Sequence, residues 1–313
     1  MSCVTFCGCD GVIRNSGVPN SQLKIQDGTA IIVVPLYADD GTENKVLRSD
    51  TKNQAFFQAK VYNTDPSKRW YPIGNFTNVV NERGESNFES FSDGSRARTY
   101  KTPRTFTGWL LGYNPVYAAM IESLRCVKVG IYLLDDCGQM TGIYCPDADG
   151  VAANDALLPI AVNESSIDSL VILQSDAAAG KVQMSFDFSQ LVKDENLRML
   201  TAAEAGNANL LTLTKLQPTN VTISGEATTG FVAAISLDYD SWTAVAVEGL
   251  VLADFYLYNE TTAAAITVTS VTEAPAGTYT FVTPAQTSTD VLTLTQSGTT
   301  SKPFGVTATI TIP

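Results

Sequence analysis

The chain has 313 residues, 44% of them hydrophobic and 17% charged, so it is long enough to bury the cores of two or three domains. Its 20 lysines and arginines stand against 32 aspartates and glutamates, and the net charge of −12 disfavours binding to nucleic-acid phosphates. The sequence contains no histidine, which excludes Ser-His-Asp and Cys-His hydrolases and histidine-ligated metal sites.

Residues 1–26 are predicted to be an arm that becomes ordered against a neighbouring molecule. They begin MSCVTFCGCDGVIRN, which lacks the basic start and apolar core of a secretory signal. We therefore expect cytosolic synthesis and free thiols at the six cysteines. Zinc bound by Cys3, Cys7, Cys9 and a remote thiolate is disfavoured, because zinc sites normally show two well-spaced ligand pairs.

Residues 27–62 are predicted to form strands separated by turns, because apolar runs alternate there with turn residues. The expected strands are AIIVVPLYA, VLRSD and QAFFQAKVY. Pro35 lies inside the first run, and since proline cannot donate a ladder hydrogen bond, we expect that strand at an edge or a bulge.

Residues 75–102 are predicted to form a long surface loop or an extended hairpin, because they are polar and punctuated by glycine and serine. A helix is expected over residues 114–125, where Asn114-Pro115 supplies a cap and a first-turn proline ahead of apolar residues at helical spacing. KVGIYLLDD, SSIDSLVILQSD and GKVQMSFDFSQL are expected strands, and NLRMLTAAEAG is an expected short helix.

From residue 216 the composition shifts to threonine, alanine, valine and serine, with one base and eight acids. Seven short β-rich runs in this region predict an immunoglobulin-like sandwich, with Trp242 and Phe255 as core aromatics. The expected domains are therefore 1–214 and 215–313. The fold class that follows is mostly β: a β-sandwich or barrel domain with one flanking α-helix, then the immunoglobulin-like sandwich.

The patterns that carry catalysis are missing. There is no glycine-rich phosphate loop, and the acidic pairs Asp39-Asp40, Asp135-Asp136 and Asp147/Asp149 lie beside glycines, where forming a turn is the better explanation. The Asp147 segment also fails as a calcium loop, because Val151 and Leu158 occupy positions that need acids. We predict no catalytic, cofactor-binding or metal-binding residue, and no enzyme.

Aromatic residues next to bases are typical of binding hot spots, and two segments show them. The first is KRWYP around Trp70, for which burial in the domain interior is the open alternative. The second is the polar segment 75–102. The candidate interface residues are Trp70, Tyr71, Arg83, Phe88, Phe91, Arg96, Arg98 and Tyr100.

The order of these parts resembles the tail tube proteins, or major tail proteins, of tailed bacteriophages. The resemblance rests on a β-rich domain with the helix 114–125, the long polar segment 75–102 before it, and the C-terminal immunoglobulin-like module. It implies a homo-oligomer of hexameric rings, stacked into a tube in the virion tail and made in the cytoplasm of the host bacterium. Its partners would be copies of itself, other tail proteins, and DNA that passes through the lumen without sequence-specific binding.

The resemblance also implies roles for the segments. GKVQMSFDFSQL and KVGIYLLDD would line the tube wall, residues 75–102 would contact the next ring, and residues 216–313 would decorate the outside. Two other functions remain open: a capsid decoration or head-fibre protein, and a carbohydrate-binding adhesive module that uses Trp70, Tyr71 or the Tyr256–Tyr258 patch.

Overall fold

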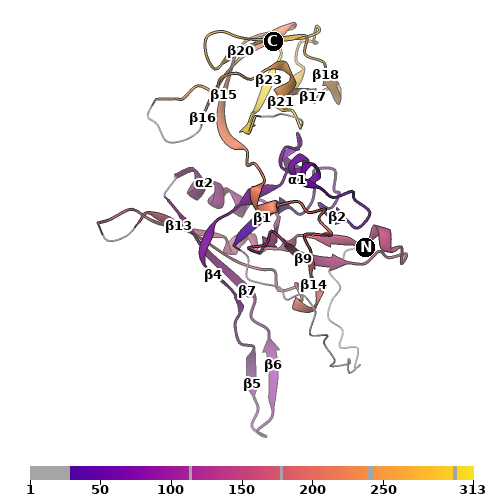
Figure 1. Cartoon of the computed structure of the whole chain (residues 1–313), viewed down its shortest axis with the longest axis vertical. Coiled ribbons are helices and arrows are strands. Elements are labelled where there is room, and N and C mark those ends of the chain that lie inside the picture. The colour runs from indigo at the N-terminus through magenta and orange to yellow at the C-terminus, as the bar shows by residue number, and fades with distance from the viewer. Residues whose placement is uncertain (1–28, 113–114, 177–178, 238–242, 299–301) are drawn as a thin grey trace. The chain divides into compact units, whose positions relative to one another are not determined.

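The computed structural model describes residues 29–112, 115–176, 179–237, 243–298 and 302–313 (Figure 1). The chain is mostly β, as predicted, with 46% of its residues in strands and two α-helices in the described part. It divides into two compact units. Unit 1 takes in the described residues up to 54, 71–112 and 117–212, and unit 2 takes in 55–70 and 213–313. No helix in the described part is both long and apolar enough to cross a bilayer.

An eight-stranded sheet forms one layer of unit 1, with the main order β2-β10-β9-β8-β1-β3; β11 pairs with β8, and β14 with β9. The bounds are β1 Ala30–Pro35, β2 Val46–Leu47, β3 Tyr71–Ile73, β8 Val129–Leu134, β9 Met140–Cys145, β10 Ala156–Leu158, β11 Ile160–Ala161 and β14 Leu197–Leu200. Every residue of β1 and β8 is buried. The core of the expected wall strand KVGIYLLDD is therefore buried within unit 1.

A four-stranded sheet with the order β12-β13-β7-β4 forms the second layer of unit 1. Its strands are β4 (Phe76–Arg83), β7 (Arg104–Leu111), β12 (Asp168–Ile172) and β13 (Lys181–Asp187). Side chains of this sheet and of the larger one share one apolar core, which also contains Ile121 of helix α2 (Pro115–Ser123). β5 (Asn87–Ser90) and β6 (Arg96–Tyr100) continue away from β4 and β7 as a hairpin (Figure 1).

The C-terminal part of unit 2 is a sandwich of two sheets around one core. The first sheet has the order β19-β20-β16-β15-β22, and the second β18-β17-β21-β23. Phe255 is buried in this core, as predicted, and Trp242 lies outside the described residues. The bounds are β15 Gln217–Ala227, β16 Gly230–Leu237, β17 Phe255–Asn259, β18 Ala264–Ile266, β19 Ser270–Glu273, β20 Thr278–Val282, β21 Val291–Gln296, β22 Phe304–Gly305 and β23 Thr307–Thr311.

Two of the expected elements are wrong. QAFFQAKVY was expected to be a strand but forms helix α1 (Gln54–Val61), the second α-helix of the described part. Phe57 and Val61, four positions apart, are buried on the same face of this helix. NLRMLTAAEAG begins as strand β14, since Leu197–Leu200 pairs with β9, and turns follow it instead of a helix. In both segments tertiary packing decided between two local structures that the sequence allows.

Candidate assembly surface

The four-stranded sheet of unit 1 has one buried face and one open face. Phe106, Leu110, Val182, Met184 and Phe186 point into the core, and the residues between them are half-buried or exposed. Strand register places the open-face residues in rows across the sheet. The open face consists of Thr77, Val80, Glu82, Thr105, Thr107, Trp109, Leu111, Asp168, Leu170, Ile172, Lys181, Gln183, Ser185 and Asp187.

Both outer strands of this sheet have a free edge among the described residues. β12 pairs with β13 alone over five residues, and β4 pairs with β7 alone over eight. Every backbone N–H and C=O group is a strong hydrogen-bonding group, so a free edge is a template for pairing with another chain. β4 is interrupted by a bulge between Thr77 and Val80, where Asn78 adopts φ = 50°.

The hairpin β5–β6 is exposed at every residue of both strands. Its aromatic side chains stay open to solvent: Phe88 is 52% exposed, Phe91 46% and Tyr100 54%. Arg96 lies over the ring of Phe88, with its guanidinium carbon 5.1 Å from the ring centroid. Exposed aromatics and arginines gathered on one projecting element are the composition of an interface anchor.

Asp194 fixes the base of this hairpin. Its carboxylate accepts hydrogen bonds from Arg83 (3.0 and 3.2 Å), Arg104 (3.2 and 3.4 Å) and Lys101 (3.3 Å). Partial burial raises the pKa of Asp194, but the hydrogen bonds and charges of these cations outweigh burial and lower the pKa to about 2. Arg83 also donates to the carbonyl of Thr102 at 2.8 Å, which joins the two strands that lead into the hairpin.

The structure separates the predicted interface residues into two groups. Trp70 is 1% exposed and packs beside Phe57, with ring centroids 6.0 Å apart. Trp70 is therefore buried in the interior, which was the alternative to an interface role. Tyr71 is half-buried in β3 and packs on the core of unit 1. Arg83 is a largely buried anchor at the hairpin base. The other five, Phe88, Phe91, Arg96, Arg98 and Tyr100, lie together on the exposed hairpin.

Some contributors to this surface were not predicted from the sequence. Asp194 was not singled out, because a single acid in a polar loop gives no signal until the fold brings three cations to it. Trp109 and Lys181 also went unnoticed; the Lys181 ammonium lies 4.2 Å from the Trp109 ring centroid on the open face. The alternation of apolar and polar residues in RTFTGWLL and KVQMSFD could have identified that face.

Asp40 and Asp135, two of the acidic residues that were assigned to turns, do hold turns. Asp135 accepts hydrogen bonds from the backbone N–H groups of Cys137 (2.9 Å) and Gln139 (2.8 Å). Asp40 accepts one from Thr42 in the same way. In the described part of the chain, no group of three or more cysteine, aspartate or glutamate residues is arranged to hold a metal ion.

The cysteines differ from the expectation of free thiols in one respect. Cys126 and Cys137 are free and exposed, but Cys145 is disulfide-bonded. Cys3, Cys7 and Cys9 lie outside the described residues. The prediction of free thiols is therefore wrong for Cys145.

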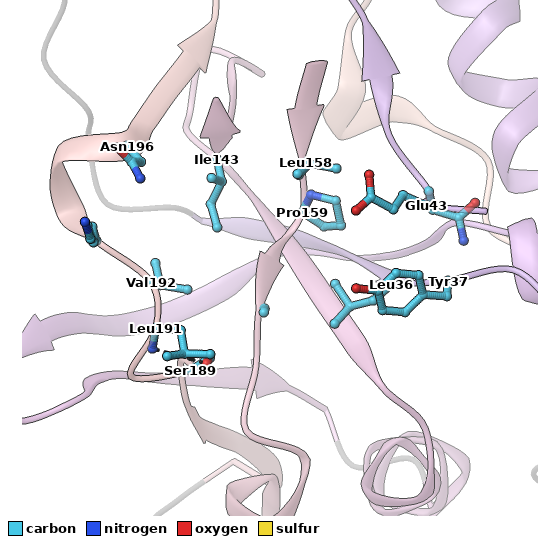
Figure 2. A pocket seen from close by; sticks show the side chains of 13 residues that line it. Leu36, Tyr37, Glu43, Ile143, Leu158, Pro159, Ser189, Leu191, Val192 and Asn196 are labelled. Atoms are coloured by element: carbon cyan, nitrogen blue, oxygen red, sulfur yellow. Dashed lines mark hydrogen bonds between the residues drawn. The ribbon is translucent and has the colours of Figure 1, made fainter. Parts of the chain in front are cut away.

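A small hollow of about 120 Å³ lies in unit 1 beside the segment that carries Asp194 (Figure 2). Leu36, Ile143, Leu158, Leu191 and Val192 give it a mostly apolar lining. Figure 2 shows the Glu43 side chain next to Pro159, on the side opposite Leu191 and Val192. A space of this size and lining suits one small apolar group.

No family model matches the chain, and no curated protein matches it. Its function is therefore inferred from the geometry of the sheet, its edges and the hairpin.

Proposed function

We propose that this chain is a non-enzymatic structural protein of the virion that assembles into stacked rings, as the tail tube proteins of bacteriophages do. The observation that carries the proposal is the pair of free edges on one four-stranded sheet, β12 at one side and β4 at the other. If β4 of one copy pairs with β12 of the next, the backbone groups of both edges are hydrogen-bonded. In a closed ring every copy makes this contact on both sides, so no strand edge remains unpaired.

Strand directions are compatible with this pairing. The four strands alternate in direction, since every neighbouring pair within the sheet is antiparallel. Rotation about a ring axis preserves each strand's direction along that axis. β4 of one copy therefore meets β12 of the next in antiparallel orientation, and the alternation continues around the ring without a defect.

The size of such a ring suits a conduit. Six copies of a four-stranded sheet give 24 strands, and strands spaced about 4.8 Å apart and tilted by about 40° close into a barrel roughly 48 Å across. Side chains about 5 Å long on the inner face leave a lumen of roughly 40 Å, which is wide enough for duplex DNA.

The open face of the sheet has the chemistry that a DNA channel requires. Among its described residues it carries Lys181 and the acids Glu82, Asp168 and Asp187, with threonine, serine and glutamine between them. Its apolar residues are Val80, Trp109, Leu111, Leu170 and Ile172. A weakly acidic hydroxylated wall repels phosphates, so DNA would pass through without binding. The complete ring would then be a passive channel, with other tail proteins at its ends.

Unit 2 fits the role of an immunoglobulin-like decoration on the assembled tube. Taken in chain order, its strands β15, β16, β20 and β19 occupy the positions of A, B, E and D in one sheet. β17, β21 and β23 occupy the positions of C, F and G in the other. This order of strands supports the immunoglobulin-like assignment.

The test is electron microscopy with light scattering over a rising protein concentration, for wild type and two variants of β4. Val80 is 47% exposed on the open face near Glu82. Val80→Glu adds an acid to the β4 edge, which would meet the β12 edge of the next copy, where Asp168 lies, whereas Val80→Lys adds a base there. Uniform rings or tubes from the wild type and from Val80→Lys, with fewer from Val80→Glu, are expected. Monomers at every wild-type concentration would refute the proposal.

A decoration or head-fibre protein is the second candidate, supported by the sandwich of unit 2. It predicts a monomer or trimer at every concentration in the same experiment, so the two functions are separated by one measurement.

A further inference from the structure

The second sheet of the sandwich in unit 2 carries two aromatic side chains on its outer face. Tyr256 and Tyr258 alternate along β17 with Phe255 and Leu257, which point into the core. The two tyrosines therefore lie on the outer face, where both are half-buried. Their ring centroids are 6.4 Å apart, and the ring planes differ by 18°. Side chains two positions apart on a strand stand about 6.6 Å from each other, so the rings keep the spacing of the strand.

Strand register surrounds these rings with hydroxyl groups. Tyr256 lies opposite Thr295 of β21, and Tyr258 lies opposite Thr293. Both rows continue to threonines of β23. The group forms two parallel rows across three strands, and we call it the tyrosine–threonine face. Its members are Tyr256, Tyr258, Thr293, Thr295, Thr307 and Thr309.

The tyrosine–threonine face contains no charged residue, although unit 2 is acidic. From residue 216 onward the chain has eight acids and one base. One of these acids, Glu260, follows Tyr258 by alternation, just past the end of β17. A neutral face on an acidic unit does not attract an anionic partner. Its chemistry favours a neutral ligand whose own polar groups are hydroxyls.

The distribution of apolar side chains argues against a protein partner at this face. Among the described residues of unit 2, the large apolar side chains that are exposed are Val245, Val251, Leu252 and Val282, and none of them lies on β17, β21 or β23. Protein interfaces are built around an apolar core. Hydroxyls around two rings instead match a saccharide, which presents C–H groups on the faces of its rings and hydroxyls at their rims.

Thr295 supplies a second observation that points to a ligand. Thr295 is 4% exposed, and its hydroxyl has no hydrogen-bond partner among the described residues. A buried hydroxyl without a partner is destabilising, because it has lost its hydrogen bonds to water and gained none in return. A ligand hydroxyl that reaches Thr295 beside Tyr256 would supply the missing partner.

We propose that the tyrosine–threonine face is a binding site for a neutral polysaccharide. Sugar rings stack on Tyr256 and Tyr258, and the threonine hydroxyls of β21 and β23 bind the sugar hydroxyls. Because the two aromatic rings are nearly parallel and follow one strand, successive sugar units of an extended chain contact both. The site goes beyond the proposed function, since binding at unit 2 does not depend on ring formation.

The other sheet of the same sandwich provides a control surface. Its outer face also carries hydroxyls, including exposed Thr222 on β15 and Thr280 on β20. Its aromatic side chains Phe231, Tyr279 and Phe281 all point into the core. The two faces therefore share hydroxyl groups and differ in the presence of aromatic rings.

The test is retention of the full chain on insoluble cellulose, chitin and cross-linked dextran, with heparin–agarose as the anionic probe. We expect at least one neutral polymer to retain the wild type and its soluble oligosaccharide to release it, with no retention on heparin. Titration with that oligosaccharide then gives the Kd. Tyr256→Ala and Tyr258→Ala should each raise the Kd about tenfold, whereas Tyr258→Phe, which keeps the ring, should stay within about threefold of the wild type.

Thr295→Val separates binding from folding, because it replaces the hydroxyl without a partner by a methyl group of the same shape. Its melting temperature should stay at or above that of the wild type, while its Kd for the oligosaccharide rises about three- to tenfold. Thr280→Ala, on the other sheet, should leave the Kd unchanged. Circular dichroism establishes that each variant is folded.

Four outcomes would overturn the site: no retention on any of the three neutral polymers, retention on heparin alone, alanine variants of the two tyrosines that bind as the wild type does, or an equal loss of binding from Thr280→Ala. The proposed function fails separately. A wild type that forms no rings but is retained on a neutral polymer, and loses retention with the tyrosines, refutes ring assembly and leaves this site standing.

Discussion

The anchor at the hairpin base gives a quantitative prediction for Asp194→Asn. Three cations surround this carboxylate, and its pKa falls from 3.8 to about 2 in the folded chain. A shift of that size corresponds to about 2.4 kcal/mol of differential stabilisation of the charged form. The carboxyl is 33% exposed, so solvent screening reduces the expected loss of stability to about 1–1.5 kcal/mol.

The pH dependence follows from the sign of the shift. Because the folded-state pKa lies below the unfolded value, the stabilisation is fully present above pH 3.8 and is lost as the pH falls toward 2. At pH 7 the variant should therefore unfold at a lower denaturant concentration than the wild type. The two curves should converge between pH 4 and pH 2.

The assay is urea unfolding of unit 1 at several pH values, followed by hydrogen exchange of the backbone amides at residues 83 and 104. Asp168→Asn is the control, because Asp168 is exposed on the open face of the same sheet. A loss of stability that stays constant from pH 7 to pH 2 would refute the electrostatic explanation and point to packing of the segment around residue 194.

Two further predictions concern close contacts within each unit. Gly206→Ala should destabilise unit 1 by about 1–3 kcal/mol, because Gly206 adopts φ = 66° and an added Cβ would collide with the carbonyl oxygen of Lys52. The measurement is a thermal melt. Gly41→Ala is the control, because Gly41 adopts φ = 79° with open space around it and so tests the backbone strain without the collision. Tyr279→Phe should destabilise unit 2 by about 1–3 kcal/mol, because the buried hydroxyl donates to the Val247 carbonyl at 2.7 Å and accepts from Leu250 N–H at 3.2 Å. Burial, with smaller contributions from nearby acids, also raises the pKa of Tyr279 to about 12, which keeps the hydroxyl protonated at pH 7. A wild-type denaturation midpoint for the variant at pH 7 would contradict this reasoning.

The strands that were predicted well have either an uninterrupted apolar run or a period-two alternation. AIIVVPLYA became the buried strand β1, but the expectation that Pro35 places it at an edge or a bulge is wrong, because β1 lies between β8 and β3. Pro35 is the last residue of β1, beyond the residues that pair with β3, where the missing donor costs little. GKVQMSFDFSQL became β13, and its alternation defines the open face of the sheet. The polar segment 75–102 proved to include strand β4 as well as the hairpin, because FTNVVNER alternates as an edge strand.

The failures came from segments whose structure depends on distant partners. Nothing local separates QAFFQAKVY as a strand from QAFFQAKVY as a helix, since its apolar residues fit both periods over eight positions. Trp70 beside two bases looked like an interface anchor, but its partner Phe57 lies on that same helix. One wrong assignment of secondary structure therefore removed the information that would have placed Trp70 in the interior.

The Asp194 anchor limits the conformational freedom of the hairpin, and this affects any contact that the hairpin makes with a neighbouring copy. A hairpin that projects from its sheet must hold one direction to dock, and an unanchored hairpin loses conformational freedom on docking. Arg83, Arg104 and Lys101 fix its base to Asp194 before any contact forms, so less freedom is lost at each stacking step. Ring closure through β4 and β12 does not use the hairpin. Asp194→Asn should therefore raise the protein concentration needed for tubes while leaving the concentration needed for rings unchanged. If the variant raises both concentrations equally, the Asp194 anchor does not act through the stacking contact.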